Sequence, residues 1–250
     1  DVREHSFGKV LDMGTGSGIL AIAAAQNPKV ESVLAADVQK EVLKYCRETI
    51  AHPKIKFAHS DLFSKIKGKF DTIIFNPPYL PDDDKIKDVA LDGGKQGYEL
   101  LQRFLENAND FLNPDGIMLI LFSSFTKKDK VDEIIKEHLL EAEQLETMHV
   151  FFEDLYVYRL KKSELLRKIE SEKISGVKYL TKGHRGFIFT GRLKNKKVVI
   201  KAKNPQSKAN GTIENEVRFL KLLNKHKIGP KLLFSNNEFF VYNYIDGKFI

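Results

Sequence analysis

The sequence predicts an α/β protein with a parallel sheet covered by helices on both faces, followed by a second, smaller α+β domain. Two observations support this prediction. Short apolar strands alternate with helices through the first 160 residues, which is typical of a buried parallel sheet. The formal charge is −7 over residues 1–160 and +14 over residues 161–250, and this reversal indicates two modules with different partners. We therefore expect domains at 1–160 and 177–250, joined by a helical linker at 161–176.

The elements of the first domain can be predicted in chain order. Strands are expected at residues 7–11, 30–36, 55–58, 72–75, 117–122 and 155–160. Helices are expected at residues 19–25, 40–50, 98–111 and 128–139. In such sheets a ligand binds beyond the carboxyl ends of the strands, at the point where the strand order reverses. Each motif described below follows one of these predicted strands.

Composition limits the class of protein. The single cysteine, Cys46, excludes a disulfide framework and a Cys-rich zinc site, and the histidines show no metal-ligand spacing, so we expect no metal. No run of about 18 apolar residues is present, so we expect no membrane span and a cytoplasmic protein. The chain opens at Asp1 without a Met or a secretory signal, and we expect that residues are missing before it.

A glycine-rich loop follows the first predicted strand. Residues 12–18 read DMGTGSG, with Asp12 ahead of the glycines Gly14, Gly16 and Gly18. Glycines allow a tight turn and close approach of a ligand to the backbone, and the helix that follows offers free N–H groups. A phosphate-binding loop is one interpretation. However, the spacing is not that of a dinucleotide-binding loop, and no P-loop lysine follows.

Two acidic residues end the next two strands. Asp37 follows the second strand, where a carboxylate can accept hydrogen bonds from both ribose hydroxyls. Asp61 follows the third strand and is placed to accept a hydrogen bond from an adenine amino group, with Leu62 or Phe63 against the ring. A lone aspartate at the position of Asp37 is usually a helix cap, and Asp61 alone is a weak signal. Together with the glycine loop, they favour binding of a nucleoside.

The sequence Asn76-Pro77-Pro78-Tyr79 directly follows the fourth predicted strand. The two prolines stiffen the loop and remove N–H donors. The side-chain oxygen of Asn76 and the carbonyl of Pro77 then form a pair of acceptors for a planar –NH2 group. Tyr79 can stack on a flat amide or base. A simple Pro-rich turn is the alternative, but the preceding glycine loop favours a site that binds an amide or amino nitrogen.

The glycine loop and the N-P-P-Y motif together resemble S-adenosylmethionine-dependent amino methyltransferases, and more narrowly the archaeal type of the HemK/PrmC glutamine methyltransferases. A D-G-G-x-x-G stretch at residues 92–97 and the closing residues 151–157 add to the resemblance, which covers residues 7–160. It implies a Rossmann-like sheet of seven strands with one antiparallel, and S-adenosylmethionine as cofactor. It implies cofactor binding by Asp12, Gly14, Gly16, Gly18, Asp37, Asp61, Leu62 and Asn76, and catalytic roles for Asn76, Pro77 and Tyr79.

The resemblance further implies a protein substrate, the glutamine of a Gly-Gly-Gln loop in a release factor, and a small activator subunit. Two alternatives remain open. Adenine and guanine amino methyltransferases use similar motifs, and the basic residues 161–250 are suited to nucleic acid, although the acidic first domain argues against a phosphate backbone there. A non-catalytic remnant that binds nucleotide or a partner is the second alternative.

The second domain is expected to hold strands at residues 179–182, 187–193, 197–203, 231–234 and 239–244, and a helix at 212–226, after a charged helix at 161–173. This order resembles the small lobe of RIO-like archaeal protein kinases. The resemblance implies ATP binding by Gly183, Gly186, Lys201 and Glu216. The catalytic residues of a kinase would lie beyond Ile250, so we expect a truncated lobe and no kinase activity from this chain.

Overall fold

The computed structural model describes residues 1–78, 94–182, 186–203 and 212–246. They form two compact units, Asp1–Ser163 and Glu164–Ile250. The charged helix expected at 161–173 is α6 (Glu164–Ser171) and belongs to the second unit, because Lys161 and Lys162 continue the last strand of the first unit. Among the described residues, no helix is both long and apolar enough to span a membrane.

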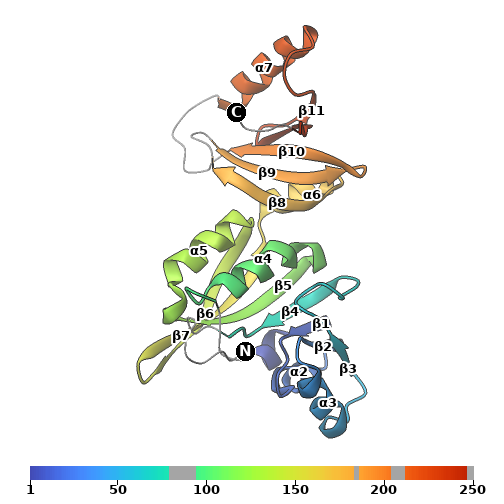
Figure 1. Ribbon diagram of the computed structural model, residues 1–250, viewed down its shortest axis with the longest axis vertical. Helices are drawn as coiled ribbons and strands as arrows, with labels where there is room; N and C mark the ends of the chain where they lie inside the picture. Colours follow the sequence, from blue (N-terminus) through green and yellow to red (C-terminus); the bar gives the residue numbers. More distant parts are fainter. Residues whose placement is uncertain (79–93, 183–185, 204–211, 247–250) are drawn as a thin grey trace. The chain divides into compact units, whose positions relative to one another are not determined.

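The first unit is a seven-stranded sheet in the order β3-β2-β1-β4-β5-β7-β6 (Figure 1). Its strands are β1 (Gly8–Met13), β2 (Val30–Asp37), β3 (Ile55–His59), β4 (Phe70–Phe75), β5 (Leu112–Ser123), β6 (Leu140–Val150) and β7 (Glu153–Lys162). Strands β1 to β5 pair in parallel, and β7 is antiparallel to both β5 and β6. The Rossmann-like sheet with one antiparallel strand is therefore confirmed.

The helices of this unit are α1 (Val2–His5), α2 (Ile19–Ala25), α3 (Lys40–Thr49), α4 (Glu99–Phe111) and α5 (Lys128–Glu137), with a 3-10 turn at Ser124–Thr126. Side chains alternate across β1, so Leu11 and Met13 pack with α4 and α5 while Val10 packs with α2. Both faces of the sheet are thus covered, which explains why the central strands β1, β4 and β5 are largely apolar and buried.

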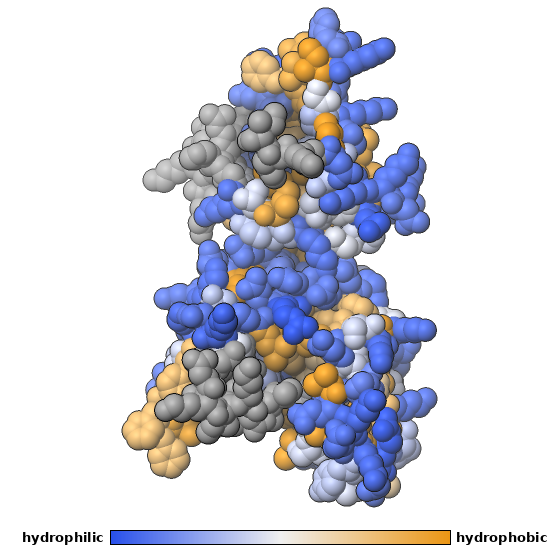
Figure 2. All heavy atoms as spheres, viewed as in Figure 1, coloured by the Kyte–Doolittle hydropathy of each residue, from blue (hydrophilic) through white to orange (hydrophobic). Residues whose placement is uncertain are grey.

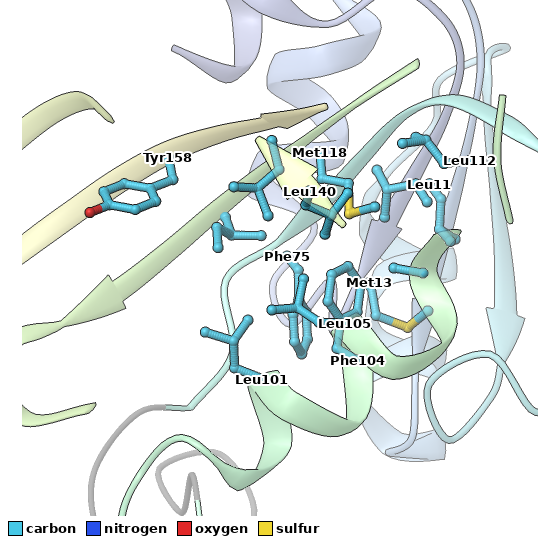
Figure 3. Packing of buried hydrophobic residues seen from close by; sticks show 14 of the residues in the cluster. Leu11, Met13, Phe75, Leu101, Phe104, Leu105, Leu112, Met118, Leu140 and Tyr158 are labelled. Carbon is cyan, nitrogen blue, oxygen red and sulfur yellow. The ribbon is translucent and has the colours of Figure 1, made fainter. Parts of the chain in front are cut away.

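The core beneath β4 fixes the segment that follows it. Phe75, the last residue of β4, stacks on Phe104 of α4 with 4.2 Å between ring centroids. Leu101 and Leu105 of the same helix pack around this pair (Figure 3). Full burial of such rings contributes on the order of 2–3 kcal/mol each. The residue that precedes the Asn76-Pro77-Pro78 segment is therefore fixed by packing.

The strands near the end of the first unit are longer than the sequence pattern indicates. β5 begins at Leu112 rather than at residue 117, and β7 runs from Glu153 to Lys162 rather than from 155 to 160. β6 and β7 form a long hairpin that closes with Val150 paired to Glu153. β6 is mostly exposed and polar at an edge of the sheet, so it lacks the apolar pattern that marks a strand.

The second unit holds a five-stranded antiparallel sheet in the order β11-β12-β10-β9-β8. Its strands are β8 (Ile174–Lys182), β9 (Gly186–Leu193), β10 (Lys196–Lys203), β11 (Leu232–Ser235) and β12 (Phe239–Asn243). The helix α7 (Thr212–Lys225) packs Ile213 and Val217 against Phe240 of β12. The structure therefore shows a second, smaller α+β unit.

Candidate functional site

The candidate site lies at the carboxyl ends of β1, β2, β3 and β4. β1 is central, and β2 and β4 flank it on opposite sides. The chain connects β1 outward to β2 and β3 and then returns to β4, so the strand order reverses between β1 and β4. This reversal is the position where open parallel sheets bind their ligands. All of the predicted motifs of the first unit that the structure describes follow strands that end here.

The glycine loop between β1 and α2 is tied to the end of β2. The backbone N–H of Gly16 donates to Asp37 Oδ2 at 3.0 Å, and the N–H of Gln39 donates to Asp37 Oδ1 at 2.9 Å. The N–H of Thr15 donates to the carbonyl of Ala36 at 2.9 Å. Each carboxylate oxygen of Asp37 accepts one of these bonds and keeps capacity for another. Asp37 therefore shapes the loop and can still receive ligand hydroxyls.

The three glycines of the loop all have positive φ. Gly16 has φ +51°, and a Cβ added there would meet nothing within 4 Å. Gly18 has φ +80°, and its added Cβ would lie 2.3 Å from Ile50 Cδ1. Gly18 is thus required by packing as well as by conformation, whereas Gly16 leaves open space above the loop. That space is where a ligand can approach the backbone closely.

Asp12 is fully buried under the loop. Its Oδ2 accepts a hydrogen bond from the Thr15 hydroxyl at 2.6 Å, while its Oδ1 has no hydrogen-bond partner in the described part of the chain. The backbone N–H of Ala21 favours the ionised form but does not reach hydrogen-bonding geometry. Burial raises the pKa of Asp12 to about 7, and the charge of Asp37 adds to the shift. An unpartnered buried carboxylate oxygen suits a cationic ligand group.

The end of β3 places Asp61 and Leu62 beside the site but removes Phe63 from it. Phe63 is buried and stacks on Phe111 at 4.6 Å between centroids, so of the two residues predicted as ring contacts Leu62 is the more accessible one. Leu62 adopts φ +42° and is partly buried. The Asp61 carboxylate is exposed and accepts hydrogen bonds from Arg103 Nη2 of α4 at 3.3 Å to both oxygens.

Asn76 and Pro77 begin the segment after β4. Asn76 is exposed, so its side-chain amide is accessible. Pro77 is buried, so the backbone directly after Asn76 is packed against the protein. Because β4 pairs with β1 as far as Phe75 opposite Met13, Asn76 lies next to the start of the glycine loop. Tyr79, the third predicted catalytic residue, lies outside the described residues, as does Gly183 of the second unit.

In the second unit, Lys201 of β10 and Glu216 of α7 form an ion pair with 2.5 Å between Nζ and Oε2. Both side chains are about three-quarters buried, with 22% and 28% exposure. Gly186 begins β9, the strand that pairs with β10. The structure therefore brings together the lysine and glutamate that the sequence pattern selected.

Three residues of the first site were not among the predicted site residues. Thr15 and Arg103 contact Asp12 and Asp61, and the Cys46 thiol donates to the carbonyl of Gly16 at 3.2 Å. Burial raises the pKa of the Cys46 thiol, which keeps it neutral. Arg103 lies 42 residues from Asp61, so only the fold joins them. Thr15 lies within the glycine loop and is the one contact that the motif could have suggested.

Known proteins with similar sequences are methyltransferases. A protein of Methanocaldococcus jannaschii described as a putative protein N5-glutamine methyltransferase is 36% identical over 155 residues, which are 59% of this chain and 78% of that protein. The release factor glutamine methyltransferase of Streptococcus pneumoniae is 33% identical over 53% of this chain and 51% of its own length. The ribosomal protein uL3 glutamine methyltransferase of Neisseria meningitidis is 32% identical over 44% of this chain and 41% of its own.

A solved structure shares the fold of the first unit. The E. cuniculi Mtq2–Trm112 complex, responsible for methylation of the translation termination factor eRF1, gives a TM-score of 0.53 at 24% identity, over 64% of this chain and 89% of that one. The chain thus spans most of the relative from Methanocaldococcus jannaschii and about half or less of the two bacterial relatives named above. Residues 1–152, which include every described residue of the candidate site, match the model of the methyltransferase small domain, and the chain therefore belongs to that family.

Proposed function

We propose that the chain transfers a methyl group from S-adenosylmethionine to the side-chain amide nitrogen of a glutamine in a protein. The observation that carries this proposal is the Asn76-Pro77 segment, which follows β4 at the strand-order reversal, beside a glycine loop with an unpartnered buried carboxylate oxygen. Relatives with the same methyltransferase domain are described as glutamine methyltransferases, which supports the choice of acceptor.

The residues of the glycine loop fit this cofactor. The buried Oδ1 of Asp12 offers an acceptor to the ammonium group of the amino acid end. Asp37 retains lone pairs for the two ribose hydroxyls. Asp61 and Leu62 stand at the end of β3, where they suit the amino group and the ring of adenine. Gly16 keeps a side chain out of the open space above the loop that the cofactor needs, while Gly14 and Gly18 supply the positive φ that the turn requires. The bound cofactor supplies an electrophilic methyl group on a positively charged sulfur.

Asn76 and Pro77 would hold the acceptor nitrogen. The Asn76 side-chain oxygen and the Pro77 carbonyl can each accept one N–H of a planar –NH2 group, which directs the nitrogen lone pair away from them. These two bonds strengthen as the nitrogen becomes positively charged, so they favour the transition state over the ground state. An amide nitrogen is a weak nucleophile, so alignment within about 3–3.5 Å of the methyl carbon is the main requirement. Tyr79 is proposed to stack on the planar amide.

The substrate we propose is a release factor or ribosomal protein with an exposed glutamine, as the descriptions of the relatives indicate. The similar structure is a complex with Trm112, which supports a small activator subunit for this chain as well.

Tritiated S-adenosylmethionine tests the proposed acceptor. The chain is incubated with a release factor that carries a Gly-Gly-Gln loop, with its Gln→Ala variant, and with a mixture of tRNA and duplex DNA. Label on the wild-type factor alone is the expected result. Label on nucleic acid would overturn the glutamine assignment in favour of base methylation. No label on any acceptor, with or without an added Trm112-type subunit, would overturn the proposed reaction.

A separate observation favours nucleotide binding by the second unit. We infer that it is a kinase small lobe of the RIO-like type that binds ATP phosphates through Lys201. The supporting facts are the antiparallel order β11-β12-β10-β9-β8, with a helix between β10 and β11, and the Lys201–Glu216 ion pair across strand and helix. These are the parts that hold the phosphate-binding lysine in protein kinases.

Equilibrium dialysis with radiolabelled Mg·ATP tests this second proposal. Saturable binding that Lys201→Met abolishes is expected, because the lysine charge that faces the phosphates is lost. Lys196→Met serves as the control, since Lys196 is an exposed lysine of the same strand. Equal binding by wild type and Lys201→Met, or no saturable binding by the wild type, would contradict the proposal.

A further inference from the structure

The β6–β7 hairpin ends in two aromatic side chains that contact almost nothing. Phe151 is 99% exposed and Phe152 is 93% exposed, and Met148 beside them is half exposed. Figure 2 shows an apolar projection at the place where this hairpin ends in Figure 1. Phenylalanines bury large apolar areas in proteins, so a pair left in water at the tip of a long hairpin is costly unless another surface covers it.

The backbone at the tip is also unfavourable for its side chain. Phe151 has φ +45°, a left-handed conformation in which a Cβ clashes with the following carbonyl. Hairpin turns usually place Gly or Asn at such a position. A bulky aromatic residue therefore works against the stability of the hairpin, and its presence calls for an explanation outside the fold.

The hairpin is held directly beside its tip, at the same edge of the sheet as Asn76. The Ser123 hydroxyl at the end of β5 donates to Glu153, and the Ser124 hydroxyl accepts from the N–H of Asp154 at 3.1 Å. His149 bonds to the carboxylate of Asp154 across the two strands. The tip is thus an extension of the strand ends that carry the candidate site.

The pairing of β4, β5 and β7 shows how far the tip of the hairpin extends beyond the end of β4. Phe75 of β4 pairs with Ile120 of β5, and Ile120 pairs with Tyr158 of β7. Phe151 therefore projects seven residues beyond that level, or roughly 23 Å at about 3.3 Å per residue. Asn76 lies one residue beyond it. A peptide of five residues centred on the acceptor glutamine extends only about 7 Å to each side, so it cannot reach the tip, whereas a folded protein can.

The charge of the hairpin indicates the chemistry of its partner. Residues 140–154 contain five acidic residues and neither Lys nor Arg. Aromatic side chains surrounded by acidic ones fit a protein surface that offers an apolar pocket with basic residues around it. We infer that the tip formed by Phe151 and Phe152 docks the methyl-acceptor protein, which must be basic around its acceptor loop. This inference rests on the proposed glutamine methyltransferase function and adds to it a binding surface outside the catalytic site.

The experiment compares two acceptors with matched variants of the full chain. A release factor with a Gly-Gly-Gln loop and a five-residue peptide centred on the same glutamine are methylated by wild type and by the double variant Phe151→Ala/Phe152→Ala. The double variant is expected to raise the KM for the protein at least tenfold and to leave kcat/KM for the peptide unchanged. Phe219→Ala, an exposed aromatic of the second unit, is the control and is expected to match the wild type with both acceptors.

An unchanged KM for the protein, or an equal loss with both acceptors, would overturn the docking surface while leaving the glutamine reaction intact. Failure of the wild type to label either acceptor would overturn the reaction instead. Direct binding of the release factor, measured by sedimentation, then still tests the tip, because the double variant must bind at least tenfold more weakly. Weakened self-association in place of weakened acceptor binding would assign the tip to a second copy of this chain.

Phe151→Asn separates a docking role from a structural one. Asn tolerates the left-handed conformation, so the melting temperature of this variant is expected to rise or stay constant while the KM for the protein acceptor rises. A lower melting temperature together with the higher KM would show that Phe151 stabilises the hairpin and would contradict the inference.

Discussion

The two halves of the candidate site are built in opposite ways. The half formed by the ends of β1 and β2 is buried and internally bonded, with Asp37 holding the glycine loop and Asp12 enclosed beneath it. The half formed by the ends of β4, β5 and β7 exposes Asn76 and the aromatic tip at Phe151 and Phe152. A small cofactor can be bound by a preformed loop, whereas a protein acceptor brings its own surface. The difference indicates that the acceptor completes the second half.

The largest expected effect concerns the exposed half. Asn76→Ala removes one of the two acceptors for the –NH2 group, and kcat should fall by about 10²–10³-fold, as for the loss of one transition-state hydrogen bond. The dissociation constant for S-adenosylmethionine should change little, because the glycine loop is untouched. Single-turnover kinetics and calorimetric binding measure the two quantities. If Asn76→Ala weakened the affinity for S-adenosylmethionine as strongly as it lowered kcat, the two halves of the site would not act separately, which would contradict this account.

The next effect concerns Asp12 in the buried half. Its pKa of about 7 lies above the ordinary 3.8, so the folded state binds more protons than the unfolded state between these values. The free energy of unfolding should therefore fall as pH rises from about 4 to about 7, by a few kcal/mol at most at about 1.4 kcal/mol per pKa unit. Asp12→Asn should remove this slope in urea titrations at a series of pH values.

Cofactor binding should show the opposite dependence on pH. An ammonium group beside Asp12 Oδ1 favours the ionised carboxylate, so the affinity for S-adenosylmethionine should increase as pH rises through 7 and then level off. In Asp12→Asn the affinity should be lower and independent of pH in this range. A wild-type affinity that falls between pH 6 and 8 would contradict the assignment of the amino acid end to Asp12.

A smaller effect distinguishes two glycines within the buried half. Gly16→Ala should cost about 1 kcal/mol in the free energy of unfolding, because its φ is unfavourable for a Cβ that meets no neighbour. Gly18→Ala should cost about 1 kcal/mol more, since its Cβ also displaces Ile50. Urea denaturation measures both. Equal costs would show that packing against Ile50 does not constrain the loop.

The smallest effect concerns the ion pair between Arg103 and Asp61. Both side chains are more than half exposed, so Arg103→Ala should change the free energy of unfolding by less than about 1 kcal/mol. In thermal unfolding, the difference between wild type and variant should be smaller at 0.5 M salt than at low salt, because salt screens an exposed ion pair. If Arg103→Ala lowered the free energy of unfolding by several kcal/mol, the ion pair would behave as a buried one, which would contradict the exposure of Asp61.

Much of this molecule can be predicted from its sequence because the informative residues are local. The glycine loop, Asp37, Asn76 and the helix at 19–25 lie within short motifs whose backbone requirements are specific. The exposed strand β6 was not predicted because an edge strand in water has no apolar alternation. Three features depend on residues brought together only by the fold and could not be predicted: the contact of Arg103 with Asp61, the bond from the Cys46 thiol to Gly16, and the burial of Phe63.

The most direct test of the central claim is to identify the methylated residue. The release factor is incubated with the chain and S-adenosylmethionine, digested, and analysed by tandem mass spectrometry, with Asn76→Ala as the matched control. The account predicts a mass gain of one methylene group on the glutamine of the Gly-Gly-Gln loop, present with the wild type and absent with Asn76→Ala. A methyl group on another residue, or the same yield from both proteins, would contradict it.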